Sequence, residues 1–380
     1  MKFTLSPQFY SKRNLWIAWI LISLIASIHR ALLLHDYNNY LIFSRPFFIL
    51  LQGGDVYLPH PELFYDLYRY SPAFALLFAP FSLLPDEIGV VLWNLLNSVV
   101  LLAGIFSLFS SESDNKKVFY FLLIIFFESL TATQNCQSNN LIAGLILLGF
   151  SSMEKNKPFA SSLFVALAGF IKIYGIAAAV MFLFYPKKKS FIAGMSLWTT
   201  ILVVLPLTVL SWGNFLNTYH SWYLTVSVAK TAIQLSVMGI LQAWFNLTPP
   251  SLYIQLAGLV ILLLPFLRTN LYSTKEFRMC VLASLMIFII IFNQMSESAT
   301  YSIALVGTAV WYLNLRKPNY IDVVFLVLVL LLASLSPTDL FPRYVREHLI
   351  IPYKLKALPL ILLWVKIQVE LWGMKQKGVE

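Results

Sequence analysis

The chain has 380 residues, of which 59% are hydrophobic and only 12% are charged. A soluble domain carries roughly 25% charged residues, so this composition excludes an ordinary soluble protein and predicts an integral membrane protein. The two cysteines, Cys136 and Cys280, give neither a disulfide framework nor the spacing of a zinc site. The formal net charge of +10 does not indicate a nucleic-acid partner, because basic residues of a membrane protein gather on one side of the bilayer.

The first apolar run, at about 14–34, is long, lacks a small-residue cleavage site and predicts a retained membrane helix. Lys2, Lys12 and Arg13 precede it. The positive-inside rule therefore places the N-terminus in the cytoplasm and His35 onward outside.

Residues 35–85 are expected to form the first extracytoplasmic loop, which mixes acids, bases and aromatics. Within it, 39–52 has the apolar spacing of a helix that lies in the membrane interface, and the Gly-Gly-Asp at 53–55 predicts its end. The stretch 71–84 is too short to cross about 30 Å of hydrocarbon and contains two prolines. We expect it to be a re-entrant or membrane-embedded helix. The acids, bases and aromatics of residues 35–85 indicate either chemistry at the membrane interface or a polar loop that lies in water.

If 71–84 does not cross, the chain makes about twelve crossings and both termini lie in the cytoplasm. The later basic clusters then also face the cytoplasm, including Arg316-Lys317 and Lys375/Lys377. The spans after the first are predicted at 88–109, 118–132, 139–152, 158–171, 173–185, 190–211, 252–267, 277–293, 299–315, 319–336 and 356–373. The fold class is therefore all-α, with residues 1–380 forming a single integral membrane domain and 212–251 forming a long outer loop.

Several functional classes lack their motifs in this sequence. There is no Walker P-loop, no GxGxxG after a strand, no HExxH and no nucleophile elbow, so a nucleotide-driven pump or a metalloprotease is unsupported. No acidic cluster is arranged for a metal, and no cofactor is expected. Apart from Glu128, Lys366 and Glu370, charges avoid the predicted span interiors. A transporter would more often place them near the bilayer midplane.

Asp36 is the leading candidate for a catalytic base. It follows the first span at the depth of a lipid phosphate and is flanked by Arg30 and His35. A carboxylate there can remove a proton from a hydroxyl, or it can be a helix-end charge satisfied by water or by Arg30. Asp55 is a weaker candidate, because the preceding glycines indicate a turn that its side chain caps.

Two basic residues are candidates for binding a phosphate. Lys172 lies between apolar helices and needs an anionic partner, which a substrate phosphate, Glu128 or Asp36 can supply. Arg69 abuts the 71–84 stretch and is suited to phosphate recognition or to anchoring at the interface.

Polar and aromatic groups on the predicted outer side are candidates for sugar binding. The QNCQSNN turn offers amides that can bond sugar hydroxyls, or it is an ordinary polar turn between helices. His220 lies among aromatics that form either a sugar platform or an interfacial belt. Glu297 can contact substrate or act as a charge at a helix N-terminus.

The order and spacing of HDYNNY, GGDVY, YRYSPAFALLFAPFSLLP, QNCQSNN and GFIKIYG followed by FLFYPKKK resemble one known family. This is the polyprenol-phosphate-mannose-dependent mannosyltransferase-like family, glycosyltransferase family 87. The resemblance runs from about residue 30 to 240 and fades afterwards. It implies a GT-C fold with an active site on the extracytoplasmic face, a polyprenyl-phosphate sugar donor and transfer with inversion to a glycan or glycolipid acceptor.

The resemblance also implies roles for individual residues. The base in the first outer loop corresponds to Asp36, and the donor phosphate is expected to meet Lys172, Arg69 and Arg30. In the long outer loop, a polar-plus-glycine motif corresponds to Gln234, Ser236 and Gly239. The side chains expected to bind sugar or acceptor are Asp55, Tyr57, Gln134, Asn135, Gln137, Asn140, Tyr174, His220, Gln234 and Glu297.

The chain departs from this family pattern at NQMSESATY, where relatives often place a histidine. This indicates a different arrangement at the donor phosphate and a divergent branch. A transporter or flippase of lipid-linked sugars remains the alternative from another class, and a non-catalytic assembly partner is a third. The expected location is the cell (inner or plasma) membrane, in contact with membrane lipids.

Overall fold

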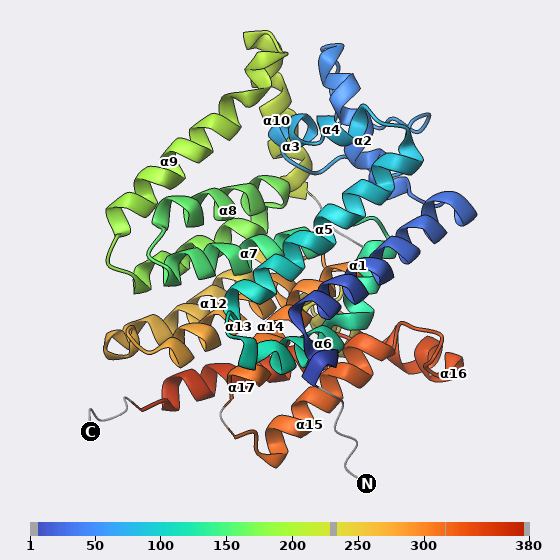
Figure 1. The fold of residues 1–380 in the computed structure, drawn as a ribbon. Helices are drawn as coiled ribbons and strands as arrows, with labels where there is room; N and C mark the ends of the chain where they lie inside the picture. The colour runs from blue at the N-terminus through green and yellow to red at the C-terminus, as the bar shows by residue number, and fades with distance from the viewer. Residues whose placement is uncertain (1–6, 229–233, 316, 376–380) are drawn as a thin grey trace. The chain divides into compact units, whose positions relative to one another are not determined.

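The computed structural model describes residues 7–228, 234–315 and 317–375. Over these residues the protein consists of helices and connecting turns and has no strand, which confirms the all-α prediction (Figure 1). Three basic residues used to predict the topology, Lys2, Arg316 and Lys377, lie outside the described residues.

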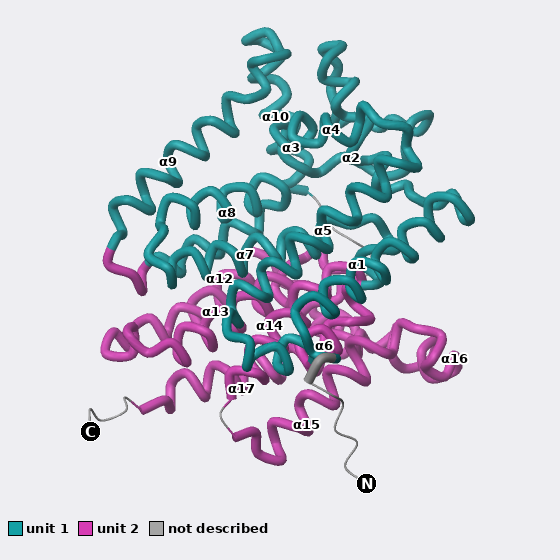
Figure 2. Tube along the Cα trace, viewed as in Figure 1, with its two compact units in different colours: residues 1–119, 130–182, 187–229 teal, residues 120–129, 183–186, 230–380 magenta. Residues whose placement is uncertain are grey.

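The chain divides into two compact units (Figure 2). Unit 1 contains residues 1–119, 130–182 and 187–229, and unit 2 contains residues 120–129, 183–186 and 230–380. Helix α6 (Asn115–Gln134) contributes both of its ends to unit 1 and its middle to unit 2. The prediction of one domain over 1–380 stays a prediction.

Four helical segments are long and apolar enough to cross a membrane, by length and composition. They correspond to the predicted spans 14–34, 88–109, 118–132 and 190–211, and their apolar character is that of a membrane protein. These segments are α1 with the π-helical turn η2 (Lys12–Leu34), α5 (Asp86–Leu108), η3 with α6 (Glu112–Gln134) and α9 with η5 (Lys188–Thr208).

The remaining predicted spans are helical but shorter. Since a helix rises about 1.5 Å per residue, these segments fall below the usual length of a crossing, and the total of about twelve stays a prediction. The segments are α7 (Asn139–Glu154), α8 (Pro158–Ile171), η4 (Ile173–Phe184), α12 (Ser251–Leu263) with η6 (Leu264–Leu267), α13 (Lys275–Ile291), η8 (Ser298–Thr300) with α14 (Tyr301–Asn314), α15 (Tyr320–Leu328) with η9 (Val329–Leu335), and α17 (Leu358–Gly373).

Glycines bring the first helices of unit 1 close together. Helix α5 packs against α1 and α7, and α7 packs in turn against α8 (Figure 1). A Cβ atom on Gly144 of α7 would lie 2.5 Å from the carbonyl oxygen of Val100 on α5, and one on Gly104 would lie 2.8 Å from the carbonyl oxygen of Gly144. Small residues at such a crossing allow the two backbones to approach closely.

The predicted helix at 39–52 is α2 (Asn38–Leu51). It ends as the Gly-Gly-Asp pattern predicts. Gly53 adopts a left-handed φ of 71°, its N–H donates to Leu50 at 2.9 Å, and the Gly54 N–H donates to Ile49 at 2.9 Å. These two bonds form a Schellman cap, which satisfies carbonyls at the helix end and favours glycine.

The stretch 71–84 forms two short helices, α3 (Pro72–Leu77) and α4 (Ala79–Ser82). Phe78, the residue that joins the two helices, packs against aromatic rings of their neighbours. Its ring lies 5.6 Å from that of Phe43 in α2 and 4.8 Å from that of Trp93 in α5, centroid to centroid. An ion pair between Arg45 of α2 and Asp86 at the start of α5 fixes the same arrangement. Whether these helices enter the membrane stays a prediction.

The predicted outer loop at 212–251 is largely helical in the described residues, because its aromatics recur at helical spacing. In helix α10 (Trp212–Val228), Phe215 meets Tyr219 edge to face at 5.0 Å and Tyr219 meets Trp222 edge to face at 5.9 Å, centroid to centroid. Such i, i+3 and i, i+4 pairs stabilise a helix. The other short helices are α11 (Val237–Phe245), η1 (Pro7–Tyr10), η7 (Thr269–Leu271), α16 (Arg343–Val345) and η10 (Arg346–Ile350).

The crossing of α5 and α7 yields a stability prediction. Gly144→Ala should force these helices apart and lower the free energy of unfolding by about 1–3 kcal/mol, as overpacking usually does. Thermal unfolding of the purified protein in detergent measures this change. Gly213→Ala is the matched control, since a Cβ there meets nothing within 4 Å. Equal melting temperatures for the two variants would contradict the tight crossing.

Candidate active site

The candidate site of unit 1 is built around the turn from Gln134 to Asn139, which joins α6 to α7. Four consecutive side chains around its end are buried: Gln137 is 6% exposed, Ser138 and Asn139 are 0% exposed and Asn140 is 1% exposed. Backbone groups of a buried turn need partners, since water cannot reach them. Cys136 has a left-handed φ of 52°, which costs a non-glycine residue free energy.

Helix α5 supplies partners for this turn from one face. The indole N–H of Trp93 donates to the carbonyl oxygen of Cys136 at 2.9 Å, and the amide of Asn94 donates to that of Thr133 at 3.1 Å. One turn further along α5, the side-chain oxygen of Asn97 accepts from the N–H of Leu141 at 3.0 Å. These three residues lie on one side of α5 because their spacing is close to that of a helical turn.

The first candidate group, Asp36, reaches the turn through Arg30. The guanidinium of Arg30 donates to the carbonyl oxygen of Gln134 at 2.7 Å and pairs with the Asp36 carboxylate at 2.7 Å. Arg30 belongs to the π-helical turn η2 (His29–Leu34), which ends before His35. His35 has a left-handed φ of 48° and reverses the chain direction ahead of Asp36. The Asp36 side chain is 59% exposed, so a hydroxyl from a substrate can approach it.

A neighbouring amide strengthens the same side of the turn. The side chain of Asn39 donates to the carbonyl oxygen of Asn135 at 2.8 Å, and the Asn135 amide donates to Thr131 at 2.8 Å. Gln134 and Asn135 therefore meet the Asp36 segment through their backbone oxygens. Their predicted side-chain bonds to sugar stay predictions.

Lys172 reaches the other end of the turn. It follows α8 directly, and its ammonium donates to the side-chain oxygens of Asn139 at 2.8 Å and Gln137 at 3.3 Å. The ring of Tyr70 lies 5.8 Å from the ammonium, and the Tyr174 hydroxyl donates to the same Asn139 oxygen at 3.3 Å. These acceptors are neutral amides. Of the two protein carboxylates considered as its partners, Asp36 pairs with Arg30 and Glu128 pairs with Lys356.

Asp55 forms a bridge within unit 1. One carboxylate oxygen accepts from the Tyr57 N–H at 2.9 Å, which is the predicted turn cap, and the other accepts from the Ser221 hydroxyl of α10 at 2.7 Å. Tyr57 is only 5% exposed and donates its hydroxyl to the carbonyl oxygen of Tyr70 at 2.9 Å. Burial raises the pKa of Tyr57 well above its ordinary value, so it remains a neutral donor.

The other candidates of unit 1 lie nearer the surface. Arg69 forms two bonds to the Asp66 carboxylate, at 3.0 and 3.1 Å, and this forked geometry is also the one that suits phosphate. His220 is exposed on α10. Asn140, by contrast, is buried and donates to the Thr133 hydroxyl at 3.3 Å.

Two candidates belong to unit 2. Gln234 has a left-handed φ of 40°, and Ser236 caps α11 by accepting from the Gly239 N–H at 3.4 Å. Glu297 precedes η8, and its carbonyl oxygen accepts from the Thr300 hydroxyl at 2.7 Å. Glu297 stands directly before η8, where a charge at a helix N-terminus would lie, and makes no side-chain capping bond there in the described structure.

The site contains residues that the sequence interpretation missed. No role was predicted for Asn139, although its side-chain oxygen accepts hydrogen bonds from both Lys172 and Tyr174. The predicted span 88–109 contains Trp93, Asn94 and Asn97, and no role was predicted for them. Two asparagines three residues apart in a membrane helix nevertheless indicate a buried polar partner. Among the residues that the structure describes, no group of three or more His, Cys, Asp or Glu side chains is arranged to hold a metal ion.

The comparisons with known proteins support the resemblance found in the sequence. A sequence model of glycosyltransferase family 87 matches residues 68–337, which is well over half of the chain. No curated protein matches the chain. The match starts after Asp36 and Asp55, so their assignment depends on local geometry and on the resemblance of the first loop. The family match favours glycosyl transfer and gives no support to the transporter alternative. The chain belongs to glycosyltransferase family 87 and is a glycosyltransferase with apolar helices typical of a membrane protein.

Proposed function

We propose that this glycosyltransferase has a GT-C fold and moves a sugar, mannose in the first instance, from a polyprenyl phosphate to a glycan or glycolipid. One observation carries the proposal: the buried turn Gln134–Asn139 meets the Arg30–Asp36 pair through its first residue and Lys172 through its last. The six residues of this turn span at most about 22 Å. A base and a phosphate-binding cation therefore belong to one neighbourhood, and these are the two groups that a single displacement requires.

In the proposed reaction Asp36 removes the proton from the acceptor hydroxyl. The hydroxyl oxygen forms a bond to the anomeric carbon while the bond from that carbon to the phosphate oxygen breaks, and the electron pair leaves with the polyprenyl phosphate. Attack from the face opposite the leaving group inverts the anomeric configuration. One carboxylate is enough, because no covalent sugar–enzyme intermediate is needed. The ion pair with Arg30 keeps the Asp36 carboxylate oriented.

Positive charge at the donor phosphate stabilises the leaving group as negative charge develops on it. Lys172 is suited to this role because the side-chain oxygens of Gln137 and Asn139 accept from its ammonium and orient it. Arg69 and Arg30 can add to this charge if a phosphate replaces the Asp66 carboxylate or approaches the Arg30 guanidinium. Tyr174, hydrogen-bonded to Asn139, stands beside the same ammonium.

The sugar and the acceptor are proposed to lie against the polar groups that surround this neighbourhood. In unit 1 these are the Asp55–Ser221 bridge and the exposed His220 of α10. The lipid tail of the donor would lie among apolar helices, with the reaction on the extracytoplasmic face of the cell membrane and both termini in the cytoplasm. This orientation follows from the positive-inside rule.

The assignment of Asp36 as the base yields a kinetic prediction. Asp36→Asn should lower kcat by about 10²- to 10⁴-fold, because an amide cannot accept the proton from the acceptor hydroxyl. The measurement is transfer of radiolabelled sugar from polyprenyl-phosphate-mannose in membranes with matched amounts of protein. Asp339→Asn is the control, since that side chain is fully exposed in unit 2. Wild-type transfer by Asp36→Asn would move the base elsewhere, with Asp55 next.

The assignment of Lys172 to the donor phosphate yields another kinetic prediction. Lys172→Met should raise KM for the donor by about 10- to 100-fold, the usual effect of losing one charge-assisted hydrogen bond. Steady-state kinetics with varied donor at saturating acceptor measures this change. Lys117→Met removes an exposed lysine that pairs with Asp114 and should leave KM unchanged. If the two lysine variants behave alike, Lys172 does not bind the donor.

A further inference from the structure

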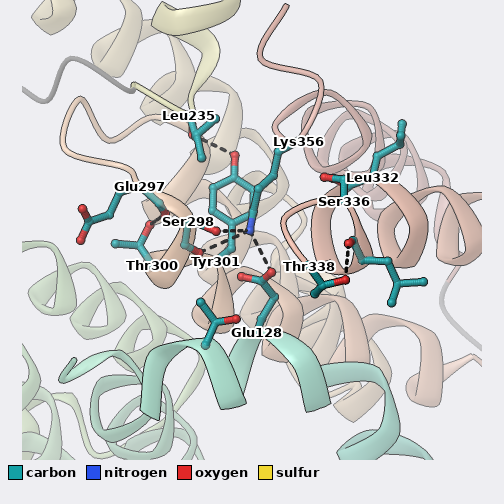
Figure 3. A network of polar contacts seen from close by, with 12 residues as sticks. Glu128, Leu235, Glu297, Ser298, Thr300, Tyr301, Leu332, Ser336, Thr338 and Lys356 are labelled. Carbon is teal, nitrogen blue, oxygen red and sulfur yellow. Dashed lines mark hydrogen bonds and ion pairs between the residues drawn. The ribbon is translucent and has the colours of Figure 1, made fainter. Parts of the chain in front are cut away.

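Unit 2 contains a connecting segment, residues 336–357, that joins η9 to α17 and is fixed in the core of the unit at both ends. Ser336 and Lys356 are buried. The Lys356 ammonium lies 2.8 Å from Glu128 Oε1 and donates to the Ser298 hydroxyl at 2.7 Å (Figure 3). Because separating a buried ion pair leaves an unpaired charge, the end of the segment at Lys356 is costly to move.

The middle of the connecting segment exposes large apolar side chains. They are Leu340 (75% exposed), Tyr344 (72%), Ile351 (56%), Tyr353 (48%) and Leu349 (46%). Neighbouring exposed apolar side chains on this scale mark a surface that binds a protein partner or a membrane.

The backbone of the connecting segment is hydrogen-bonded within the segment itself. Helix α16 continues into η10, and the following turns begin with bonds from the N–H of Ile351 to Arg346 and from that of Leu355 to Ile350, both at 3.0 Å. Residues 343–350 rise about 12 Å at most, well short of the roughly 30 Å of hydrocarbon in a bilayer. A segment of this length with paired backbone groups can enter the interface of a membrane but cannot cross the bilayer.

The charged side chains of the connecting segment largely neutralise one another. The Arg343 guanidinium lies 2.7 Å from the Glu347 carboxylate, and that of Arg346 lies 3.3 Å from the Asp339 carboxylate. Between the two fixed ends, Lys354 is the remaining lysine or arginine. A surface with this near balance of charge offers little to a highly charged partner. Its apolar side chains are therefore the feature that a partner would recognise.

Aromatic side chains with a polar edge belong to the same surface. The indole N–H of Trp244, on α11, donates to the carbonyl oxygen of Tyr353 at 2.7 Å, and Trp244 is itself 42% exposed. The exposed ring of Tyr344 stacks on that of His348 at a centroid distance of 4.2 Å. Tryptophan and tyrosine are enriched where a membrane meets water, because their rings are apolar and their N–H or O–H groups are polar. The aromatic residues thus favour a membrane interface.

The apolar surface continues into the helices on both sides of the connecting segment. Exposed apolar side chains precede it on α15 and η9 and follow it on α17, among them Ile321, Val327, Leu331, Leu362, Val365 and Val369. The long apolar helices of this chain are typical of a membrane protein. A lipid bilayer therefore accounts for the exposed side chains of the helices and of the segment together, whereas a protein partner would have to cover both.

We propose that residues 339–355 lie in the interface of the phospholipid bilayer. Tyr344 enters the outer part of the acyl chains, whereas the neighbouring Arg343 stays among the headgroups with Glu347. Because burial of apolar surface drives this association and the charges are paired, the segment should insert to the same depth in zwitterionic and anionic lipid. The sugar, its donor and its acceptor play no part in this role, so it does not depend on the proposed transfer reaction.

The test compares neighbouring side chains that are similarly exposed in the protein. Arg343 and Tyr344 form one pair, at 80% and 72%, and Asp339 and Leu340 form the other, at 102% and 75%. Each of the four is replaced in turn by cysteine and labelled with a nitroxide, and the full-length protein is reconstituted into phosphatidylcholine vesicles. The unsubstituted protein is the labelling blank, because both native cysteines are buried.

The ratio of oxygen to nickel-chelate collisions with the nitroxide reports its depth, since oxygen concentrates in lipid and the chelate stays in water. This ratio should be several-fold higher for Tyr344→Cys than for Arg343→Cys, and likewise for Leu340→Cys relative to Asp339→Cys. The ratios should stay the same when phosphatidylglycerol replaces part of the phosphatidylcholine. Melting temperatures check that each variant is folded, and two pairs keep the test decisive if one substitution lowers the melting temperature.

Three results would overturn the proposal. High access of the nickel chelate to all four labels would place the segment in water. Low access of both reagents to Tyr344→Cys and Leu340→Cys would mean that protein, such as a second copy of the chain, covers the surface. A higher ratio only in vesicles that contain phosphatidylglycerol would show that charge, rather than apolar burial, drives the association.

Discussion

The arrangement of unit 1 depends on satisfying the backbone of a buried polar turn. A turn placed among apolar helices must find protein partners for its carbonyl oxygens, because each unpaired group would cost about 1–3 kcal/mol. Side chains from η2, α2 and α5 provide these partners, through Arg30, Asn39, Trp93 and Asn94. Elements that are distant in sequence therefore contact the same six-residue turn. The candidate base and the candidate phosphate ligand lie on the chain segments that make these contacts.

Several residues with left-handed backbone conformations lie near the candidate site residues. Left-handed φ angles at His35, Asp66 and Cys136 lie beside Asp36, Arg69 and the buried turn, and Gln234 is the corresponding case in unit 2. Residues in this region cost free energy that neighbouring contacts must offset, and such residues gather at functional sites. These four positions lie near candidate site residues, whereas the left-handed residues Asn156, Asn246 and Lys354 do not, so strain alone does not identify the site.

Local patterns predicted the fold better than the site. The helix at 39–52 and its glycine end were predictable because apolar spacing and a Gly-Gly pair act over a few residues. The helical content of 212–251 was missed because its polar residues outweighed an aromatic repeat at helical spacing. Gln137 was predicted to bind sugar, and that role stays a prediction. Its side-chain oxygen and that of Asn139, for which no role was predicted, accept from Lys172. Which groups pair across a fold is set by long-range packing that sequence spacing does not encode.

The central claim is that one carboxylate activates the acceptor in a single displacement at a lipid-phosphate donor. The most direct measurement is the anomeric configuration of the product, determined by NMR after transfer from a polyprenyl-phosphate mannose of defined configuration. The account predicts that the configuration at the anomeric carbon is inverted. A product that retains the donor configuration would contradict it, because retention requires a second displacement through a covalent intermediate.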